Sequence, residues 1–277
     1  MTARLLPAFL CLLAIIPLNA GPLPEITAKS AILVDANTGK VLFSKNDTAQ
    51  RPVASTQKLI TALIVAESGD LDRKVEIEAV DTDCEPTKIN VKAGQAYSRL
   101  QLLNALLVKS GNDAARALAR DNAGSISAFA DKMTAKVRSL GGTNSNFVNP
   151  NGLPAQGQYS TARDMARVAR MAYRNATLRE IMKTRYYNFR FSSGNVVPLR
   201  NTNRVLRTYS FCNGMKTGYT DLAGHCLVSS GSYNGRDVIA VMLGGTKARI
   251  ADESAKLLAY GLNIPTSKLN SLRISQE

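Results

Sequence analysis

The chain is organised around one stretch, Arg51-Pro-Val-Ala-Ser55-Thr-Gln-Lys58-Leu-Ile-Thr-Ala-Leu-Ile-Val-Ala-Glu67. From Ser55 to Ala66 nearly every residue is apolar or a good helix former, and a helix that is apolar all round belongs inside a domain. Residues three apart lie on the same face of a helix, so Ser55 and Lys58 place a hydroxyl and an amine side by side near its start. The stretch therefore predicts a buried helix that carries a nucleophile beside a possible base.

A purely structural explanation of these two residues is the stronger one when the stretch is taken alone. Ser55 is a good N-cap residue, and Lys58 could extend its amine from a buried helix to water. The pattern Ser-x-x-Lys also arises by chance roughly once in a chain of this size. The rest of the sequence has to decide between the two interpretations.

Residues 1–20 differ in composition from the rest of the chain and predict a secretory signal peptide. Arg4 gives a short positive region, Leu5 to Ile16 is an apolar run, and Leu18-Asn-Ala20 offers a small residue for cleavage. The run is shorter than the ~20 residues that span a bilayer, and no other segment is long and apolar enough. We expect a secreted protein, periplasmic or extracytoplasmic, with no transmembrane segment in the mature chain.

The chain of 277 residues carries a formal net charge of +14. A basic exported protein suits anionic surfaces such as cell-wall polymers or lipid headgroups, although a generally basic solvated surface explains the charge equally well. The positive residues are scattered and no nucleic-acid motif is present, so we expect no nucleic-acid partner.

Cysteine and histidine usage limits the possible chemistry. Cys84, Cys212 and Cys226 remain after the signal, and an odd count is not a complete disulfide framework; a bridge between Cys212 and Cys226 is conceivable. No two cysteines have metal-ligand spacing, and His225 is the single histidine. We expect no metal and no cofactor, and a Ser-His-Asp triad would depend on His225 alone.

Hydrophobic periodicity and turn residues divide the chain into elements. A hairpin is predicted over Ser30–Asp35 and Lys40–Ser44, followed by the helix of the opening stretch and a polar segment with small strands such as Ile89–Val91. Helices are predicted over Leu100–Val108, Asp113–Asp121, from Ser125 or Ser127 to Leu140, from Thr161 with Asp164 in a capping-box-like position, at Thr177–Glu180 and over Ala248–Leu262. Later strands are predicted over Tyr186–Phe191, Asn195–Leu199, Phe211–Thr217, His225–Ser230 and Val238–Leu243, and the last fifteen residues as a tail.

This order of elements predicts an α+β fold. Strands at both ends of the chain form a single antiparallel sheet flanked by helices, and a helical lobe of roughly residues 98–184 is inserted between them. A cleft forms where two lobes meet, and such junctions favour ligand sites.

Two further polar clusters follow the first. Ser110-Gly111-Asn112 interrupts an apolar helical stretch, and Lys216-Thr217-Gly218 ends a strand. Taken alone, one is a helix stop with a cap and the other a strand end with a turn glycine. Together with Ser55-x-x-Lys58 they have the order and rough spacing of the signature of penicillin-binding proteins and serine β-lactamases.

From about residue 24 to 262 the chain resembles the D-alanyl-D-alanine carboxypeptidase family of low-molecular-weight penicillin-binding proteins. The resemblance implies a β-lactamase/transpeptidase-like fold in one penicillin-binding or D,D-peptidase domain over residues 21–277. The motifs that carry it are Pro52-Val-Ala-Ser55-Thr-Gln-Lys58, Leu107-Val-Lys-Ser110-Gly-Asn-Asp-Ala-Ala115, Asn149-Pro-Asn-Gly-Leu-Pro154, Tyr159-Ser-Thr-Ala-Arg-Asp-Met165 and Gly214-Met-Lys-Thr-Gly-Tyr-Thr220.

The resemblance implies an enzyme that removes the terminal D-alanine of peptidoglycan stem peptides and is acylated by β-lactam antibiotics. Ser55 would attack the penultimate carbonyl, Lys58 would act as base, and Ser110 would relay a proton to the leaving nitrogen. Asn112 would bind the substrate amide and Lys216 would hold a positive charge. Backbone N–H groups of Ser55 and Tyr219 would form the oxyanion hole, and Thr217, followed by Gly218, would bind the terminal carboxylate.

Two lysines without a histidine make chemical sense. A free lysine has a pKa of about 10.4, so Lys58 can act as base only if it is uncharged. A second cation about 4 Å away costs the charged form roughly 4 kcal/mol at an effective dielectric of about 20, or about three pKa units. We predict that Lys216 supplies this cation and is the main reason that Lys58 is neutral.

Some alternatives stay open at this point. A D,D-endopeptidase that cuts cross-links would carry the same motifs; a β-lactamase would need a deacylating Glu loop, which is not found; a non-catalytic peptidoglycan-binding module would need a broken motif. Thr202 takes the place of the arginine that the family uses for the carboxylate, with Arg200 and Arg204 beside it. The chain ends soon after Leu262, so we expect neither the β-rich second domain nor the amphipathic anchor of many relatives.

Overall fold

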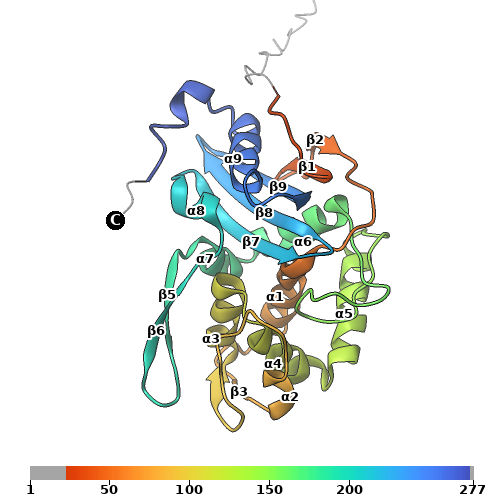
Figure 1. Cartoon of the computed structure of the whole chain (residues 1–277), viewed down its shortest axis with the longest axis vertical. Helices are drawn as coiled ribbons and strands as arrows, with labels where there is room; N and C mark the ends of the chain where they lie inside the picture. Colours follow the sequence, from red (N-terminus) through yellow and green to blue (C-terminus); the bar gives the residue numbers. More distant parts are fainter. Residues whose placement is uncertain (1–22, 275–277) are drawn as a thin grey trace, which may run out of the picture.

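The computed structural model describes residues 23–274, so the predicted signal peptide lies outside the described residues. A five-stranded antiparallel sheet is built from both ends of the chain, as predicted (Figure 1). Strand β7 is an edge of this sheet. In spatial order the strands are β2 (Val41–Lys45), β1 (Ser30–Asp35), β9 (Arg236–Gly245), β8 (Gly224–Tyr233) and β7 (Cys212–Thr220).

Helices cover both faces of the sheet, because successive strand side chains point to opposite sides. Ala31 and Leu33 of β1 pack into one hydrophobic cluster with the C-terminal helix α9, while Ile32 and Val34 pack into a larger cluster on the other side. Figure 1 shows α8 and α9 on one face, with α6 behind the sheet. The helices at the sheet are α6 (Ala162–Arg174), α7 (Ala176–Lys183), α8 (Arg204–Thr208) and α9 (Ile250–Gly261).

The opening stretch forms the central helix, but it starts later than predicted. A 3-10 turn over Ala54–Gln57 precedes α1 (Lys58–Glu67), because Ala54 turns the chain tightly with a φ of 48°. Neither segment has a side-chain cap, so the N-cap interpretation of Ser55 is wrong. The α1 residues from Lys58 to Leu63 are all buried, in contact with α4, α5 and α6.

The elements between the two halves of the sheet also form two small two-stranded sheets. β3 pairs with β4 and β5 pairs with β6, each antiparallel and apart from the main sheet. No helix among residues 23–274 combines the length and the apolar character needed to cross a membrane. The elements are β3 (Lys74–Glu76), α2 (Ala79–Thr82), β4 (Ala96–Ser98), α3 (Arg99–Asn104), a π-helical turn (Ala105–Lys109), α4 (Asn112–Ala123), α5 (Ile126–Ser139), β5 (Tyr186–Arg190) and β6 (Val196–Arg200).

Several local predictions are corrected by tertiary contacts. The helix predicted over Leu100–Val108 changes to a π-helical turn at Ala105. Ile89–Val91 is not a strand, since the backbone N–H groups of Ile89 and Asn90 donate to the buried carboxylate of Asp113.

The helix caps predicted from the sequence are observed in part. Ser125 caps α5, and Thr161 caps α6 by accepting a hydrogen bond from the N–H of Asp164. The Asp164 carboxylate does not close a capping box; it accepts instead from the N–H of Asn144 and the hydroxyl of Ser145. The described part of the predicted tail pairs with the chain after α8, where the N–H of Ile274 donates to the carbonyl oxygen of Thr208.

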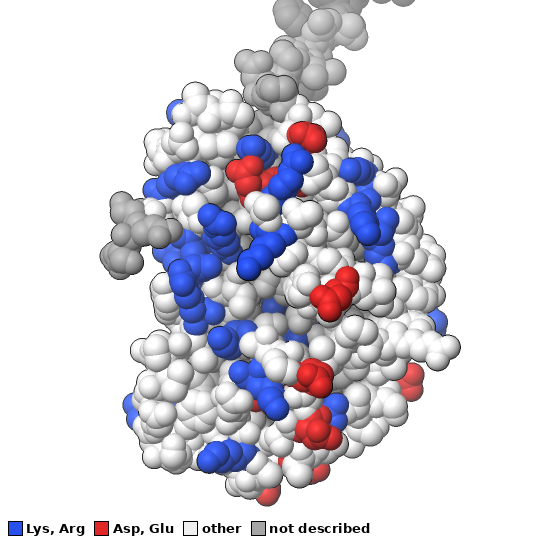
Figure 2. Space-filling model, viewed as in Figure 1, with Lys and Arg blue, Asp and Glu red and all other residues white. Residues whose placement is uncertain are grey.

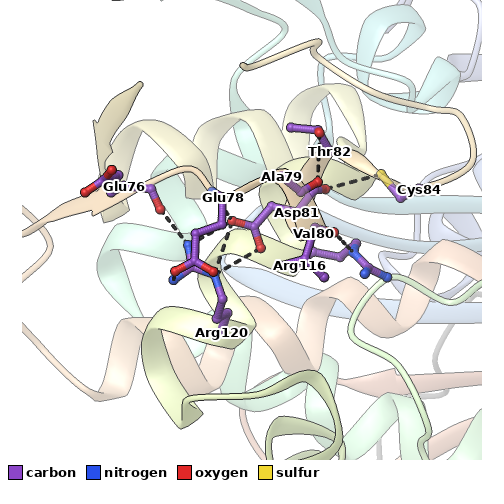
Figure 3. A network of polar contacts seen from close by, with 9 residues as sticks. All are labelled: Glu76, Glu78, Ala79, Val80, Asp81, Thr82, Cys84, Arg116 and Arg120. Atoms are coloured by element: carbon purple, nitrogen blue, oxygen red, sulfur yellow. Dashed lines mark hydrogen bonds and ion pairs between the residues drawn. The ribbon is translucent and has the colours of Figure 1, made fainter. Parts of the chain in front are cut away.

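One polar network holds α2 against α4, and Figure 3 shows it. Arg120 of α4 forms ion pairs with Asp81 at 2.8 Å and Glu78 at 2.7 Å, and Arg116 donates to the carbonyl oxygen of Val80 at 2.9 Å. The segment that follows α2 forms a wall of the cleft described below, so this network supports the site from behind.

We expect Arg120→Ala to reduce the free energy of unfolding by about 3 kcal/mol, because the Asp81 carboxylate, 1% exposed, loses its cation. Arg116→Ala is the matched control: its exposed hydrogen bond is worth about 0.5–1 kcal/mol. Urea unfolding of both variants measures the difference. Equal losses would show that the Arg120 ion pairs add nothing to stability.

Candidate active site

The three polar clusters converge on one cleft of about 520 Å³. It lies between the edge strand β7, the start of α1 and the segments before α4. Chain segments more than 100 residues apart thus supply one site. The predicted residues that line it are Ser55, Ser110, Asn112, Thr217, Gly218 and Tyr219.

Lys58 lies fully buried directly behind Ser55. Its Nζ is 2.8 Å from Ser55 Oγ, 2.7 Å from Asn112 Oδ1 and 2.6 Å from the carbonyl oxygen of Asn151. The amine therefore does not extend to water, and the interpretation of Lys58 as a lysine that reaches the surface is wrong.

The backbone around Asn112 fixes this arrangement. Asn112 Nδ2 donates to the carbonyl oxygen of Glu85 at 2.8 Å, and the backbone N–H of Asn112 donates to the carbonyl oxygen of Thr87 at 2.7 Å. The side chain of Asn112 thus orients its Oδ1 toward Lys58. The sequence had not singled out the Glu85–Thr87 wall, because Glu85 contacts Asn112 across 27 positions of the chain, with several other elements between them.

The loop before α6 is a second element that sequence reasoning did not assign to the site. The carbonyl oxygen of Asn151 accepts from Lys58 and, at 3.3 Å, from Ser55 Oγ. Thr61 donates to the carbonyl oxygen of Pro150 at 2.7 Å, which ties this loop to α1. The Asn149–Pro154 motif was the available signal, but a backbone carbonyl leaves no mark on residue type.

Ser110 ends the π-helical turn in a left-handed conformation, with a φ of 71°. Few residues other than glycine adopt this conformation, and it clusters at functional sites. It is 7% exposed and lines the cleft. The predicted break between two helices therefore places Ser110 at the cleft.

Burial lowers the pKa of both lysines. Lys216 is 1% exposed, donates to the carbonyl oxygen of Thr217, and has a pKa lowered to about 7. The pKa of Lys58 is lowered well below its usual value, first by burial and second by the charge of Lys216. Our prediction that Lys216 is the main cause is wrong, because desolvation of the enclosed amine is the larger of the two causes.

Thr202 is a further residue that lines the cleft. The hydroxyls of Thr202 and Thr217 are 2.6 Å apart. Arg204 lines the cleft and Arg200 does not, which separates the two arginines that the sequence left open.

His225 and Cys226 also line the cleft. The ring of His225 packs 4.4 Å from that of Tyr219, and burial lowers the pKa of this histidine. Neither residue could be placed here from the sequence, since both come from the neighbouring strand β8.

The three cysteines in residues 23–274 are free, so the conceivable bridge is not formed. Cys212 and Cys226 lie in adjacent strands but far apart along them: Cys212 is opposite Gly231, and Cys226 is opposite Gly218. They also belong to hydrophobic clusters on opposite faces of the sheet. Burial raises the pKa of the Cys212 thiol to about 12 and that of Cys226 to about 11.

The fold and the cleft define a serine peptidase in which a buried lysine stands beside the serine. The chain belongs to the D-alanyl-D-alanine carboxypeptidase family, peptidase family S11, whose profile matches residues 18–247. The family resemblance noted in the sequence is thereby confirmed.

The relatives that are similar to the chain include proteins named carboxypeptidases and proteins named endopeptidases. D-alanyl-D-alanine carboxypeptidase DacB2 of Mycobacterium tuberculosis (strain ATCC 25618 / H37Rv) is 34% identical over 263 residues, which cover 92% of this chain and 90% of the relative. The D-alanyl-D-alanine endopeptidase of Escherichia coli (strain K12) is 35% identical, covering 83% and 76%. For D-alanyl-D-alanine carboxypeptidase DacF of Bacillus subtilis (strain 168), at 34% identity, the match covers 79% of this chain and 58% of the relative.

Solved structures confirm the α+β, transpeptidase-like fold. The crystal structure of D-alanyl-D-alanine carboxypeptidase from Mycobacterium tuberculosis H37Rv has a TM-score of 0.84 at 31% identity, covering 90% of this chain and 96% of that one. A mutant of the Streptomyces K15 DD-transpeptidase has a TM-score of 0.81 at 31% identity, covering 86% and 98%.

Proposed function

We propose that the protein is a serine-type D-Ala-D-Ala carboxypeptidase that removes the terminal D-alanine of peptidoglycan stem peptides. The observation that carries the proposal is the 2.8 Å contact of a buried Lys58 amine with Ser55 Oγ. We further propose that residues 21–277 form one peptidase domain, with a helical lobe of roughly residues 98–184. Residues 1–20 are proposed to direct it to a periplasmic or other extracytoplasmic site.

A neutral Lys58 fits its surroundings as a base. A neutral Lys58 keeps two N–H bonds for Asn112 Oδ1 and the carbonyl oxygen of Asn151. Its lone pair can then accept the Ser55 proton once the hydroxyl turns away from the Asn151 carbonyl oxygen. Lys58 takes the Ser55 proton as Oγ attacks the penultimate carbonyl carbon. Asn112 is then a residue that positions Lys58 while it faces the substrate.

The rest of the reaction uses groups around the cleft. Backbone N–H groups of Ser55 and Tyr219 stabilise the oxyanion, and Ser110 passes the proton to the departing nitrogen. The C–N bond breaks, D-alanine leaves, and water hydrolyses the Ser55 ester. Lys216 and Gly218 hold the extended substrate peptide along the edge strand β7.

Thr217, Thr202 and Arg204 are proposed to hold the terminal carboxylate, because the two hydroxyls are 2.6 Å apart and Arg204 lines the same cleft. We expect Arg204→Gln to lower kcat/KM for a D-Ala-D-Ala peptide about tenfold, the usual worth of one charged hydrogen bond. Arg200→Gln is the control that leaves this value unchanged. An equal loss on a C-terminally amidated peptide would contradict the role of Arg204.

Mass spectrometry after exposure to benzylpenicillin tests the function itself. We expect a covalent adduct on a Ser55 peptide in the intact protein and none in Ser55→Ala. A second test follows D-alanine release from a purified pentapeptide. A protein that forms no adduct and releases no D-alanine is not the enzyme proposed here.

Gly218 allows β7 to approach the serine. A Cβ at this position would lie 2.7 Å from the backbone N of Ser55 and 2.9 Å from that of Thr56. We expect Gly218→Ala to slow acylation by benzylpenicillin about 10²-fold, because Ser55 must move. Gly231→Ala is the control: it crowds Leu262 and the Phe211 backbone on the next strand, far from Ser55. Similar acylation rates in the two variants would show that general destabilisation, and not displacement of Ser55, is the cause.

A further inference from the structure

A wall of the cleft has no regular secondary structure: residues 85–90, which we call the wall segment. Pro86 and Thr87 of this segment line the cleft. Backbone outside helices and strands needs hydrogen-bond partners from elsewhere in the fold, because it has no ladder of its own. The first two residues of α4 supply these partners, and each binds a different kind of backbone group.

Asn112 and Asp113 hold the two ends of the wall segment. Asn112 donates two hydrogen bonds to carbonyl oxygens at its start, as described above. Asp113 accepts hydrogen bonds from N–H groups at its end: Oδ2 is 2.8 Å from the N of Asn90 and 3.0 Å from the N of Ile89. One turn of one helix thus fixes the whole wall segment.

Asp113 is buried without a cation. Its side chain is 0% exposed and forms no ion pair with a Lys or Arg of residues 23–274. Figure 2 shows, by contrast, acidic side chains gathered on the surface of the lobe that contains β3, α2 and α4.

Backbone N–H groups replace water around the Asp113 carboxylate. Besides the two from the wall segment, the N–H of Ala114 donates to Oδ1 at 2.9 Å. Asp113 also lies in the first turn of α4, where the helix dipole favours negative charge. A buried carboxylate is stable where such donors surround it, so the end of the wall segment cannot leave Asp113 without exposing an unpaired charge.

The wall segment and the catalytic groups share Asn112. The hydrogen bond from its Nδ2 to the carbonyl oxygen of Glu85 orients its Oδ1 toward Lys58, whose Nζ lies at 2.7 Å. The same Nζ contacts Ser55 Oγ at 2.8 Å. A shift of the wall segment therefore changes the partners that orient Asn112 and, through it, the amine beside the serine.

Resting on the proposed function, we propose that Asp113 is a positioning residue for the acylation of Ser55, because it holds the wall segment on α4. It does not line the cleft, so it acts through the backbone that it binds. The chain before the wall segment is fixed separately, by the network that holds α2 on α4 in Figure 3. Asp113 therefore controls the other end, at residues 89 and 90.

Asp113→Asn tests the proposal, since it keeps the size of the side chain but replaces one acceptor oxygen with an NH₂ group that cannot accept. We expect the first-order rate constant of acylation at saturating benzylpenicillin to fall about 10- to 10²-fold, as for a small displacement of reacting groups. The number of Ser55 sites finally acylated per folded molecule should stay at the wild-type value. A merely structural role would lower the amount of folded protein and leave this rate constant unchanged.

Asp121→Asn is the matched control. Asp121 is a second buried carboxylate of α4, and its ion pair with Arg99, at 2.6 Å, lies near the end of the helix away from the cleft. Both substitutions should lower the urea midpoint of unfolding, but Asp121→Asn should leave the acylation rate constant unchanged. Equal slowing in the two variants, or no slowing in Asp113→Asn, overturns the proposal.

Amide hydrogen exchange, followed by NMR, tests the contact without relying on activity. The N–H groups of Ile89 and Asn90 should be protected in the wild-type protein although they lie outside helices and strands. Asp113→Asn should lose this protection and Asp121→Asn should keep it. Exchange of both amides at the unfolded-chain rate in the wild type overturns the proposal even if Asp113→Asn does not fold.

The same experiments separate this proposal from the proposed function. A wild-type protein that forms no adduct with benzylpenicillin refutes the proposed function, whereas the exchange of Ile89 and Asn90 still shows whether Asp113 holds the wall segment. A wild-type protein that is acylated, with Asp113→Asn acylated at the same rate, refutes the role of Asp113 alone.

Discussion

Lys58→Met is expected to lower the rate of acylation by benzylpenicillin about 10²- to 10⁴-fold, the range for loss of a general base. Methionine keeps the length and the burial of the side chain, but it offers no lone pair to the Ser55 hydroxyl. The Lys58 Nζ contact of 2.8 Å with Ser55 Oγ is the only element of the proton transfer that this change removes directly. Stopped-flow or quenched acylation with intact-mass detection measures the rate.

Lys132→Met on α5 is the control, because Lys132 is exposed and donates to Asn122 away from the cleft. Thermal unfolding of Lys58→Met should be cooperative, which separates a chemical loss from a folding defect. If Lys58→Met is acylated within threefold of the wild-type rate, the base is another group and the proposed mechanism is wrong.

Lys216→Met is expected to slow acylation at pH 7 about 10²-fold, since it removes a polar group from β7, the strand along which the substrate binds. The variant should also change the pH dependence of acylation. The charge of Lys216 lowers the pKa of Lys58, so the rising limb of the acylation profile should move to higher pH in the variant. The shift should be limited, because burial is the larger cause and persists. A rate profile from pH 5 to 10 measures it.

The same variant has a stability signature with a definite sign. The folded-state pKa of Lys216 is lowered to about 7, so between that pH and its ordinary value near 10.5 the unfolded chain binds the extra proton. Stability from this group therefore rises with pH through the window, by up to about 1.4 kcal/mol per pH unit. Lys216→Met should lose that slope in urea unfolding. An unchanged slope and an unshifted rate profile would mean that Lys216 does not titrate in this range.

The sequence determined the fold to a large extent. The strands of the main sheet lie where alternating apolar residues and turn residues predict them, with ends that differ by a few residues. The antiparallel pairing of β7, β8 and β9 follows from short turns such as that between β8 and β9, whereas the pairing of β1 with β9 joins the two ends of the chain. The helix boundaries at Ser125 and Thr161 likewise follow from local capping.

Local reasoning failed where a distant segment supplies the hydrogen-bond partner. Ile89–Val91 has the composition of a strand, but its N–H groups bind Asp113, 24 residues away for Ile89. The last residues have the composition of a tail, yet Arg273 pairs with Tyr209. Such partners have no periodicity to reveal them.

The motifs and their order, through their resemblance to the family signature, were enough to select Ser55, Lys58, Ser110, Asn112 and Lys216 as one group. The tertiary structure alone decided the protonation of this group, because a pKa depends on how completely an amine is removed from water and not on which residue it is. It also placed the carbonyl oxygen of Asn151, the hydroxyl of Thr202 and the side chain of Arg204 at the cleft. Backbone atoms, neutral hydroxyls and surface arginines occur throughout any chain, and only their position in space distinguishes these.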